Sequence, residues 1–208
     1  MVIVFEGIDG SGKTTISNMI FNEISQVFPG EVFWFSEPSP TELGKHLKDI
    51  LTLERFKLSI PEQLLLFTAD RMWLLRNYVI PYSRENKIIL MDRSFVSTYA
   101  YQVMNVEDEE TCRILVDLTE HSIRDFYIDI LFYLDCPSEI SLGRIKVKDG
   151  IESRGVDFIE KVRRNYLAFL QTPHEHIRKV VVINATEDLE NVYQKVRGVI
   201  LDHIGYIT

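Results

Sequence analysis

The chain has 208 residues, of which 46% are hydrophobic and 26% charged, and its net charge is −8 at neutral pH. These values predict one soluble globular domain over residues 1–208 and argue against a general nucleic-acid-binding or membrane-binding surface. No apolar run approaches the length of a membrane span. Cys112 and Cys136 show neither a disulfide framework nor metal-ligand spacing, and the first residues lack the basic region of a signal peptide, so we expect a cytoplasmic protein.

The first fifteen residues contain a phosphate-binding motif. The apolar run 2–5 predicts a buried strand, and residues 7–14 then match G-x-x-x-x-G-K-[ST]. We expect Lys13 to reach the outer phosphates of a nucleotide and Thr14 to bind Mg²⁺. A glycine-rich turn without a ligand is the alternative, which the complete motif between a strand and a helix disfavours. The expected nucleotide-binding residues of this loop are Gly7, Asp9, Gly10, Ser11, Gly12, Lys13, Thr14 and Thr15.

The rest of the chain alternates strand-like and helix-like segments. Apolar runs predict strands at 2–5, 32–35, 88–91, 130–134 and 180–183. Helical spacing predicts helices at 14–27, from 41 to about 51, from 59 to 79 or 82, and at 94–104, 107–124, 138–147, 157–176 and 189–204. Continuous apolar strands separated by helices indicate a doubly wound α/β fold with a parallel five-stranded sheet.

Charged residues stand where these strands end. They are Asp9, Glu37, the pair Asp92-Arg93 and Asp135. Because ligands of such folds bind outside the carboxyl ends of the strands, we expect several of these side chains to share a site. Asp92 is a candidate Mg²⁺-side carboxylate, with a helix N-cap as the alternative, and Arg93 suits a clamp on a transferring phosphoryl group. We interpret Asp135 as a structural turn or cap residue.

Five blocks of sequence, in order along nearly the whole chain, resemble thymidylate kinases. Residues 5–15 (FEGIDGSGKTT) are similar to the opening of the family, and residues 37–44 resemble its E-P-x-x-T loop. Residues 65–71 resemble its L-L-F-x-A-D-R helix, residues 92–102 its D-R-Y-x-x-S-x-x-A-Y-Q segment, and residues 134–145 the approach to its lid. The resemblance implies a three-layer P-loop NTPase fold with a short lid at about residues 146–156.

The resemblance also implies how the base would be recognised. Phe67 would stack on the thymine ring, and Arg71, on the same helix face, would donate to a thymine carbonyl. The alternatives are a core position for Phe67 and a surface ion pair of Arg71 with Asp70 or Glu62.

The sugar and the phosphates would be held by other members of these blocks. Ser97, Tyr101 and Gln102 would line the base and sugar, with Tyr101 crowding a 2′-hydroxyl. Asp9 would hold the 3′-hydroxyl or position the acceptor phosphate, and Arg93 would bridge the two phosphates. The full acceptor set implied is Asp9, Glu37, Pro38, Lys48, Phe67, Arg71, Arg93, Ser97, Tyr101 and Gln102.

Three further positions complete the implied site. Glu37 would stand near the magnesium or the acceptor, which gives Thr14, Asp92 and Glu37 as the expected metal residues. Lys48 occupies a position where many relatives carry an arginine for the acceptor phosphate, and lysine cannot form the bidentate fork of arginine. Arg144 would stack on the adenine of ATP.

The chain departs from the family at the catalytic cation. Residues 149–152 (DGIE) have Gly150 where an arginine is expected, and Gly10 replaces the arginine that some relatives place in the phosphate loop. Lys146, Lys148 and Arg154 are the nearby replacements, and we favour Arg154 or Lys148. If these are only solvated charges, turnover would be slow.

The function predicted is ATP-dependent and Mg²⁺-dependent phosphorylation of dTMP to dTDP by a homodimer, with no nucleic-acid or membrane partner. One alternative is a kinase for another pyrimidine deoxynucleotide or a deoxynucleoside, since Ser94 replaces the tyrosine of the D-R-Y motif. A nucleotide-dependent switch is the other, although the chain has no guanine-reading N-K-x-D sequence.

Overall fold

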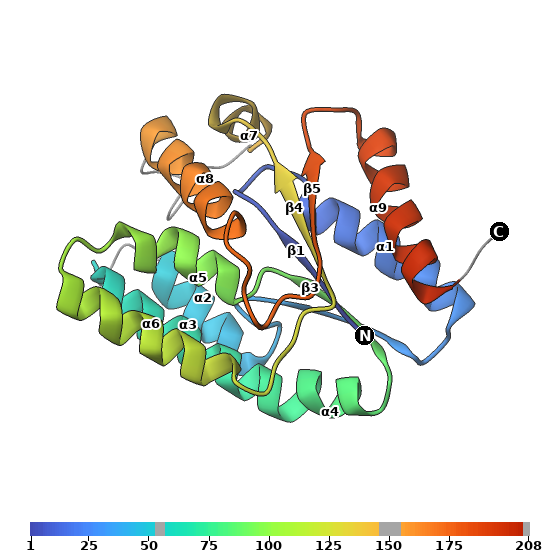
Figure 1. The fold of residues 1–208 in the computed structure, drawn as a ribbon, viewed down its shortest axis with the longest axis horizontal. Coiled ribbons are helices and arrows are strands. Elements are labelled where there is room, and N and C mark those ends of the chain that lie inside the picture. Colours follow the sequence, from blue (N-terminus) through green and yellow to red (C-terminus); the bar gives the residue numbers. More distant parts are fainter. Residues whose placement is uncertain (53–56, 146–154, 206–208) are drawn as a thin grey trace.

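The computed structural model describes residues 1–52, 57–145 and 155–205. Its strands are β1 (Val2–Glu6), β2 (Val32–Ser36), β3 (Ile88–Asp92), β4 (Ile130–Asp135) and β5 (Val180–Asn184). They form one parallel five-stranded sheet in the order β2-β3-β1-β4-β5 (Figure 1). The predicted sheet is therefore confirmed, with β1 at its centre.

The helices of the described residues are α1 (Lys13–Val27), α2 (Glu42–Thr52), α3 (Ile60–Leu74), α4 (Ile80–Arg84), α5 (Phe95–Tyr101), α6 (Glu109–Ile123), α7 (Ser138–Arg144), α8 (Val156–Leu170) and α9 (Leu189–Ile204). A π-helical turn (Leu75–Val79) joins α3 to α4, so the helix predicted from 59 toward 82 is continuous. None of these helices combines the length and the apolar character that a membrane span requires.

Side chains of β1 alternate between two cores. Val2 and Val4 belong to a core that includes α3, α5, α6 and α8, while Ile3 and Phe5 belong to a core with α1 and α9. Successive residues of a strand point to opposite faces of a sheet, so both faces are covered. Figure 1 shows the two groups of helices on either side of the sheet, which gives the three layers.

Three helices end earlier than the sequence predicts. α7, predicted over residues 138–147, ends at Arg144, and the next residue, Ile145, has an extended backbone conformation. α8 ends at Leu170 instead of near residue 176, because Pro173 lacks a backbone N–H and disfavours helical conformation in the residue before it. The predicted helix 94–104 divides into α5 and a 3₁₀ turn (Val103–Asn105), where the Asn105 side chain donates to carbonyl oxygens of the last turn of α5. The predicted lid lies almost entirely outside the described residues.

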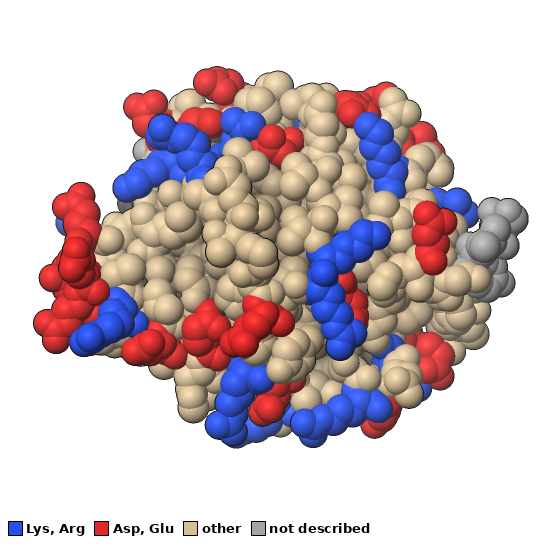
Figure 2. Space-filling view, viewed as in Figure 1, with Lys and Arg blue, Asp and Glu red and all other residues tan. Residues whose placement is uncertain are grey.

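Acidic and basic side chains are interspersed over much of the face shown in Figure 2. Acidic side chains gather at the start of α6, where Asp108 caps the helix and Glu109 and Glu110 occupy its first turn. Negative charge at a helix N-terminus is favourable because the aligned peptide dipoles leave partial positive charge there. This acidic group is thus explained by helix stability.

Backbone hydrogen bonds join the loops that leave β1, β2 and β3. The Arg93 N–H donates to the Phe5 carbonyl oxygen at 2.9 Å, and the Glu37 N–H donates to the Asp92 carbonyl oxygen at 3.0 Å. The carboxyl ends of three strands are therefore fixed beside one another at a single edge of the sheet.

Candidate active site

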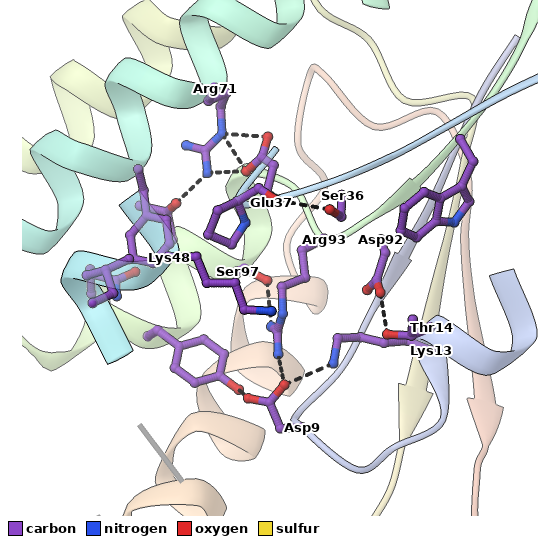
Figure 3. A pocket seen from close by; sticks show the side chains of 17 residues that line it. Asp9, Lys13, Thr14, Ser36, Glu37, Lys48, Arg71, Asp92, Arg93 and Ser97 are labelled. Carbon is purple, nitrogen blue, oxygen red and sulfur yellow. Dashed lines mark hydrogen bonds and ion pairs between the residues drawn. The ribbon is translucent and has the colours of Figure 1, made fainter. Parts of the chain in front are cut away.

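A pocket of about 530 Å³ opens at this edge of the sheet (Figure 3). It is lined by Asp9, Lys13, Thr14, Trp34, Ser36, Glu37, Pro38, Lys48, Leu51, Phe67, Arg71, Asp92, Arg93, Ser97, Thr98, Tyr101 and Gln102. Every residue predicted for the acceptor side is among them. Trp34, Ser36, Leu51 and Thr98 line the pocket as well, without a separate signal in the sequence.

The phosphate loop between β1 and α1 has a conformation that requires glycine. Gly10 and Gly12 have φ angles of +79° and +95°, which residues with a side chain rarely adopt. α1 begins at Lys13, so the first N–H groups of the helix border the loop, as in a helix-terminal anion site.

Asp9 joins two cations at the base of the pocket. Its Oδ1 accepts from Lys13 Nζ at 3.2 Å and from Arg93 Nη2 at 2.5 Å (Figure 3). Burial alone would raise the pKa of Asp9, but the charges of Arg93 and Lys13 outweigh it and hold that pKa well below its usual range. The guanidinium of Arg93 also lies over the Tyr101 ring, 5.2 Å from its centroid. The lysine of the phosphate loop and the arginine that follows β3 thus meet on one carboxylate.

Arg71 is almost completely buried, with 1% of its surface exposed. Its Nε and Nη2 donate to the Glu37 carboxylate at 2.6 to 3.1 Å, and Nη2 also donates to Thr98 Oγ1 at 2.7 Å. The remaining nitrogen, Nη1, has no hydrogen-bond partner among the described residues. Arg71 is therefore not paired with Asp70 or Glu62 on the surface, and its Nη1 is a buried donor at the pocket wall.

Phe67 lies one helical turn before Arg71 and lines the pocket without belonging to either core, so the alternative of a core position does not hold. Gln102 is buried at the pocket wall. Lys48 reaches from α2 toward Arg93 (Figure 3). These positions place an aromatic face and polar groups in one pocket, a combination that suits recognition of a nucleobase.

Thr14 and Asp92 form an oxygen-rich corner of the pocket. The Thr14 hydroxyl donates to Asp92 Oδ2, while Asp92 Oδ1 is buried and has no hydrogen-bond partner in the described part of the chain. Hard oxygen ligands of this kind fit Mg²⁺.

Glu37 differs, because both of its carboxylate oxygens accept from Arg71, which favours a positioning role over the predicted metal role. Ser94, and not Asp92, caps α5.

Of the residues predicted for the ATP side beyond the phosphate loop, the structure describes Arg144 but not Lys148 or Arg154. Arg144 ends α7 beside the phosphate loop, where its Nη1 donates to the carbonyl oxygens of Ala185 at 3.0 Å and Gly10 at 3.5 Å. It does not line the acceptor pocket, which agrees with a place on the ATP side. Lys148 and Arg154 lie outside the described residues.

Two buried residues behind the pocket have no counterpart in the predictions. Glu6 accepts hydrogen bonds from the start of α5, and Tyr166 of α8 donates to Glu6 at 2.9 Å. Glu6 directly follows the predicted strand 2–5, as other charged residues follow their strands, but nothing in the local sequence indicates its buried hydrogen-bond partners. Asp135, predicted to be a turn or cap residue, instead ends β4 and forms an ion pair with Arg163 of α8 at 2.7 and 2.9 Å, while Pro137 occupies the N-cap position of α7.

Comparison with known proteins identifies the family. A sequence profile described as Thymidylate kinase matches residues 5–196. The chain belongs to the thymidylate kinase family. A thymidylate kinase of Thermosipho africanus is 33% identical, covering 98% of this chain and 99% of its own, and one of Blochmanniella floridana is 34% identical, covering 91% and 90%. The crystal structure of a thymidylate kinase from Ehrlichia chaffeensis has a TM-score of 0.74 and 27% identity, covering 96% of this chain and 98% of that chain.

Membership of the thymidylate kinase family settles the class of reaction. The chain is a phosphotransferase, and the reaction of the family is ATP-dependent phosphorylation of dTMP. The P-loop NTPase fold is confirmed by the superposition on the Ehrlichia enzyme over nearly the whole chain. The two alternatives, a kinase for another pyrimidine deoxynucleotide or a deoxynucleoside and a nucleotide-dependent switch, are therefore disfavoured.

Proposed function

We propose that the pocket binds dTMP with its base beside Phe67 and Arg71 and its phosphate beside Arg93, while the phosphate loop presents the γ-phosphoryl group of ATP. One observation carries the proposal: Asp9 Oδ1 contacts both Lys13 of the donor loop and Arg93 of the acceptor pocket. A phosphate bound to one cation lies within reach of a phosphate bound to the other, and direct transfer needs that proximity.

The base would be selected by an aromatic face and one fixed donor. Phe67 offers the face, and Arg71 Nη1 offers the donor to a thymine carbonyl. Glu37 and Thr98 hold the other nitrogens of Arg71, so the direction of Nη1 is set before the substrate arrives. Tyr101, Gln102 and Ser97 would line the base and sugar.

The transfer itself would need no covalent intermediate. Lys13 and Arg93 stabilise the charge that spreads over the transferring phosphoryl group. Thr14 and Asp92 would hold Mg²⁺, which when bound neutralises charge on the donor phosphates. Asp9 keeps the two cations in register between the donor and acceptor phosphates.

A further cation would come from the lid, residues 146–156. Position 10 of the phosphate loop, where some relatives place an arginine, cannot supply this cation. Any side chain there would bring its Cβ atom to 2.1 Å from the Ser141 carbonyl oxygen. Arg154 or Lys148 is the proposed lid cation, and Arg144 is the proposed contact to the adenine of ATP.

We propose that this chain forms a homodimer. We also propose that residues 1–208 fold as one domain and that the protein acts in the cytoplasm. Leu65 and Met72 of α3 have exposed fractions of 54% and 42%, and Ile114 of α6 has 56%. α3 and α6 pack side by side, so their outer surfaces form an apolar face suited to a second copy. Sedimentation of the wild type should give about twice the chain mass of 24.3 kDa, and Leu65→Glu should give the single mass.

The test of the activity is a coupled assay of ADP release with ATP and each of four conditions: dTMP, dUMP, thymidine or no acceptor. We expect dTMP to stimulate ADP release most strongly and thymidine not to stimulate it. Indifference to every acceptor would contradict the proposal. A preference for thymidine would instead support the deoxynucleoside kinase alternative.

The role of Arg93 is tested in the same assay. Arg93→Ala should lower kcat/KM for dTMP by about 100-fold or more, the order of effect seen when a transition-state donor is removed. Arg84→Ala, which removes an arginine from α4 outside the pocket, is the matched control.

A further inference from the structure

Glu6, the last residue of β1, is completely buried behind the pocket. Its Oε1 accepts from the Ser94 N–H at 2.7 Å, from Ser94 Oγ at 2.8 Å and from the Ser97 N–H at 3.2 Å. Its Oε2 accepts from Ser97 Oγ at 2.7 Å and from Tyr166 Oη at 2.9 Å. Donors from α5, its N-cap and α8 therefore converge on one carboxylate.

The two hydroxyls on Oε2 also contact Arg93. Arg93 Nη1 donates to Ser97 Oγ at 3.0 Å and to Tyr166 Oη at 3.3 Å. A guanidinium only donates and an ionised carboxylate only accepts. Each hydroxyl has one hydrogen, and the two oxygens lie 2.7 Å apart. Whichever hydroxyl donates to the other, the chain of hydrogen bonds ends on Glu6 and both hydroxyls present lone pairs to Arg93.

The backbone of Arg93 has an unusual conformation that the surrounding contacts must hold in place. Its φ angle is +77°, a conformation that residues with a side chain seldom adopt and that the surroundings must impose. On the opposite side, Arg93 Nη2 is held by Asp9. The guanidinium is thus fixed by Asp9 at one nitrogen and by the Glu6-oriented hydroxyls at another.

We propose that Glu6 and Tyr166 are positioning residues for Arg93. Glu6 sets the direction of the Ser97 and Tyr166 hydroxyls, and these hold the guanidinium in the orientation used for phosphoryl transfer. The inference rests on the phosphate-binding role given to Arg93 under the proposed function. It also gives Ser97 a second role beside lining the sugar.

The decisive variant is Tyr166→Phe, which removes one oxygen and keeps the ring. That ring packs on Tyr133 with 5.2 Å between centroids and on Tyr101 with 6.1 Å. We expect kcat/KM for dTMP to fall about tenfold, as for loss of one transition-state orienting contact, with little change in melting temperature. Glu6→Gln should lower it further, because an amide can donate to the hydroxyls and reverse their direction.

Tyr99→Phe is the matched control. The Tyr99 hydroxyl also donates to a carboxylate, that of Glu120, and its ring packs on Phe169 of α8, but it does not line the pocket. This variant should keep the wild-type kcat/KM. Equal losses in Tyr99→Phe and Tyr166→Phe would show that a buried tyrosine hydroxyl acts only through general stability, and the proposal would be wrong.

A double-mutant cycle separates this inference from the proposed function. If Tyr166 acts through Arg93, Tyr166→Phe should have no further effect on kcat/KM for dTMP in the Arg93→Ala background. Independent, multiplicative losses would overturn the positioning role while leaving the role of Arg93 intact. If Arg93→Ala alone keeps full activity, the role proposed for Arg93 in phosphate binding is wrong, and the single variant shows this independently of Tyr166.

Discussion

The backbone of Ser141 in α7 lies against Gly10 of the phosphate loop. A Cβ atom on Gly10 would be 2.1 Å from the Ser141 carbonyl oxygen and 2.8 Å from its carbonyl carbon. Backbone atoms cannot move aside as the end of a flexible side chain can, so the contact excludes a larger residue at position 10. It couples the nucleotide loop to the helix that leads toward the predicted lid.

Gly10→Ala should therefore weaken nucleotide binding and stability together. The substitution meets both a positive φ angle and a backbone clash, which together should cost about 2–4 kcal/mol of unfolding free energy and raise the KM for ATP about tenfold or more. Thermal unfolding measures the loss of stability, and an activity assay at varied ATP concentration measures the KM. Gly143→Ala in α7 is the control, since a Cβ atom there meets nothing within 4 Å. Equal behaviour of the two variants would refute the coupling.

The Glu37–Arg71 pair should matter far more than an exposed pair of the same type. Glu37→Ala leaves the guanidinium of Arg71 buried without its carboxylate, which typically costs about 3–5 kcal/mol. Chemical denaturation measures it, and the KM for dTMP should rise because Arg71 Nη1 loses its direction. Glu31→Ala removes the partner of Lys87 at an exposed site and should change stability little. A similar small effect for Glu37→Ala would show that the pair does not hold Arg71.

Asp92→Asn should raise the Mg²⁺ concentration needed for half-maximal activity. The amide keeps the size of the side chain but replaces a carboxylate ligand by a weaker neutral one, so about a tenfold shift is expected, as when a metal-site partner is lost. A titration of activity against Mg²⁺ at saturating ATP gives the value. An unchanged Mg²⁺ requirement would place the ion elsewhere, and EDTA should abolish activity in either case.

Much of the site could be predicted because its parts are local in sequence. Phe67 and Arg71 share a helix face four residues apart. Asp92 ends the apolar strand β3 and Arg93 follows it, so spacing and strand order place these residues at one edge. The partner of Arg71 could not be predicted, because Glu37 lies 34 residues away and the carboxylates of the same helical segment, Asp70 and Glu62, are nearer in sequence. Only the folded sheet brings β2 and α3 together.

Glu6 and Tyr166 were beyond prediction for a related reason. Their contact spans 160 residues, and each stands in a segment whose apolar pattern predicts only burial. The early end of α8 at Leu170 could have been predicted, because Pro173 in the sequence disfavours a helix that continues to residue 176. Periodicity thus specifies which face of an element is buried, while the identity of a buried polar partner depends on the tertiary arrangement.

The pH dependence of activity should report on Glu6 rather than on Asp9. The pKa of Asp9 is depressed by Arg93 and Lys13 against the opposing effect of burial, so its contribution to stability is present above the pKa of the unfolded chain and is lost only as pH falls through the folded pKa. Asp9 therefore stays ionised throughout any practical assay range. An acid limb in the activity profile above the usual range of aspartate must have another source.

Burial raises the pKa of Glu6, with Arg93 and the hydrogen bonds of Ser97, Ser94 and Tyr166 opposing the shift only in part. Stability linked to Glu6 is then fully present below the unfolded glutamate pKa and is lost as pH rises toward the folded value. Unfolding free energies of wild type and Glu6→Gln, measured from acid to neutral pH, should show the wild type losing stability relative to the variant as pH rises. Protonated Glu6 can donate to the Ser97 and Tyr166 hydroxyls and so disturb the orientation of Arg93. Because the pKa of Glu6 is raised, wild-type kcat should begin to fall on acidification at a pH above the ordinary pKa of glutamate. Glu6→Gln should lack that limb, and a variant that retained it would assign the limb to another group.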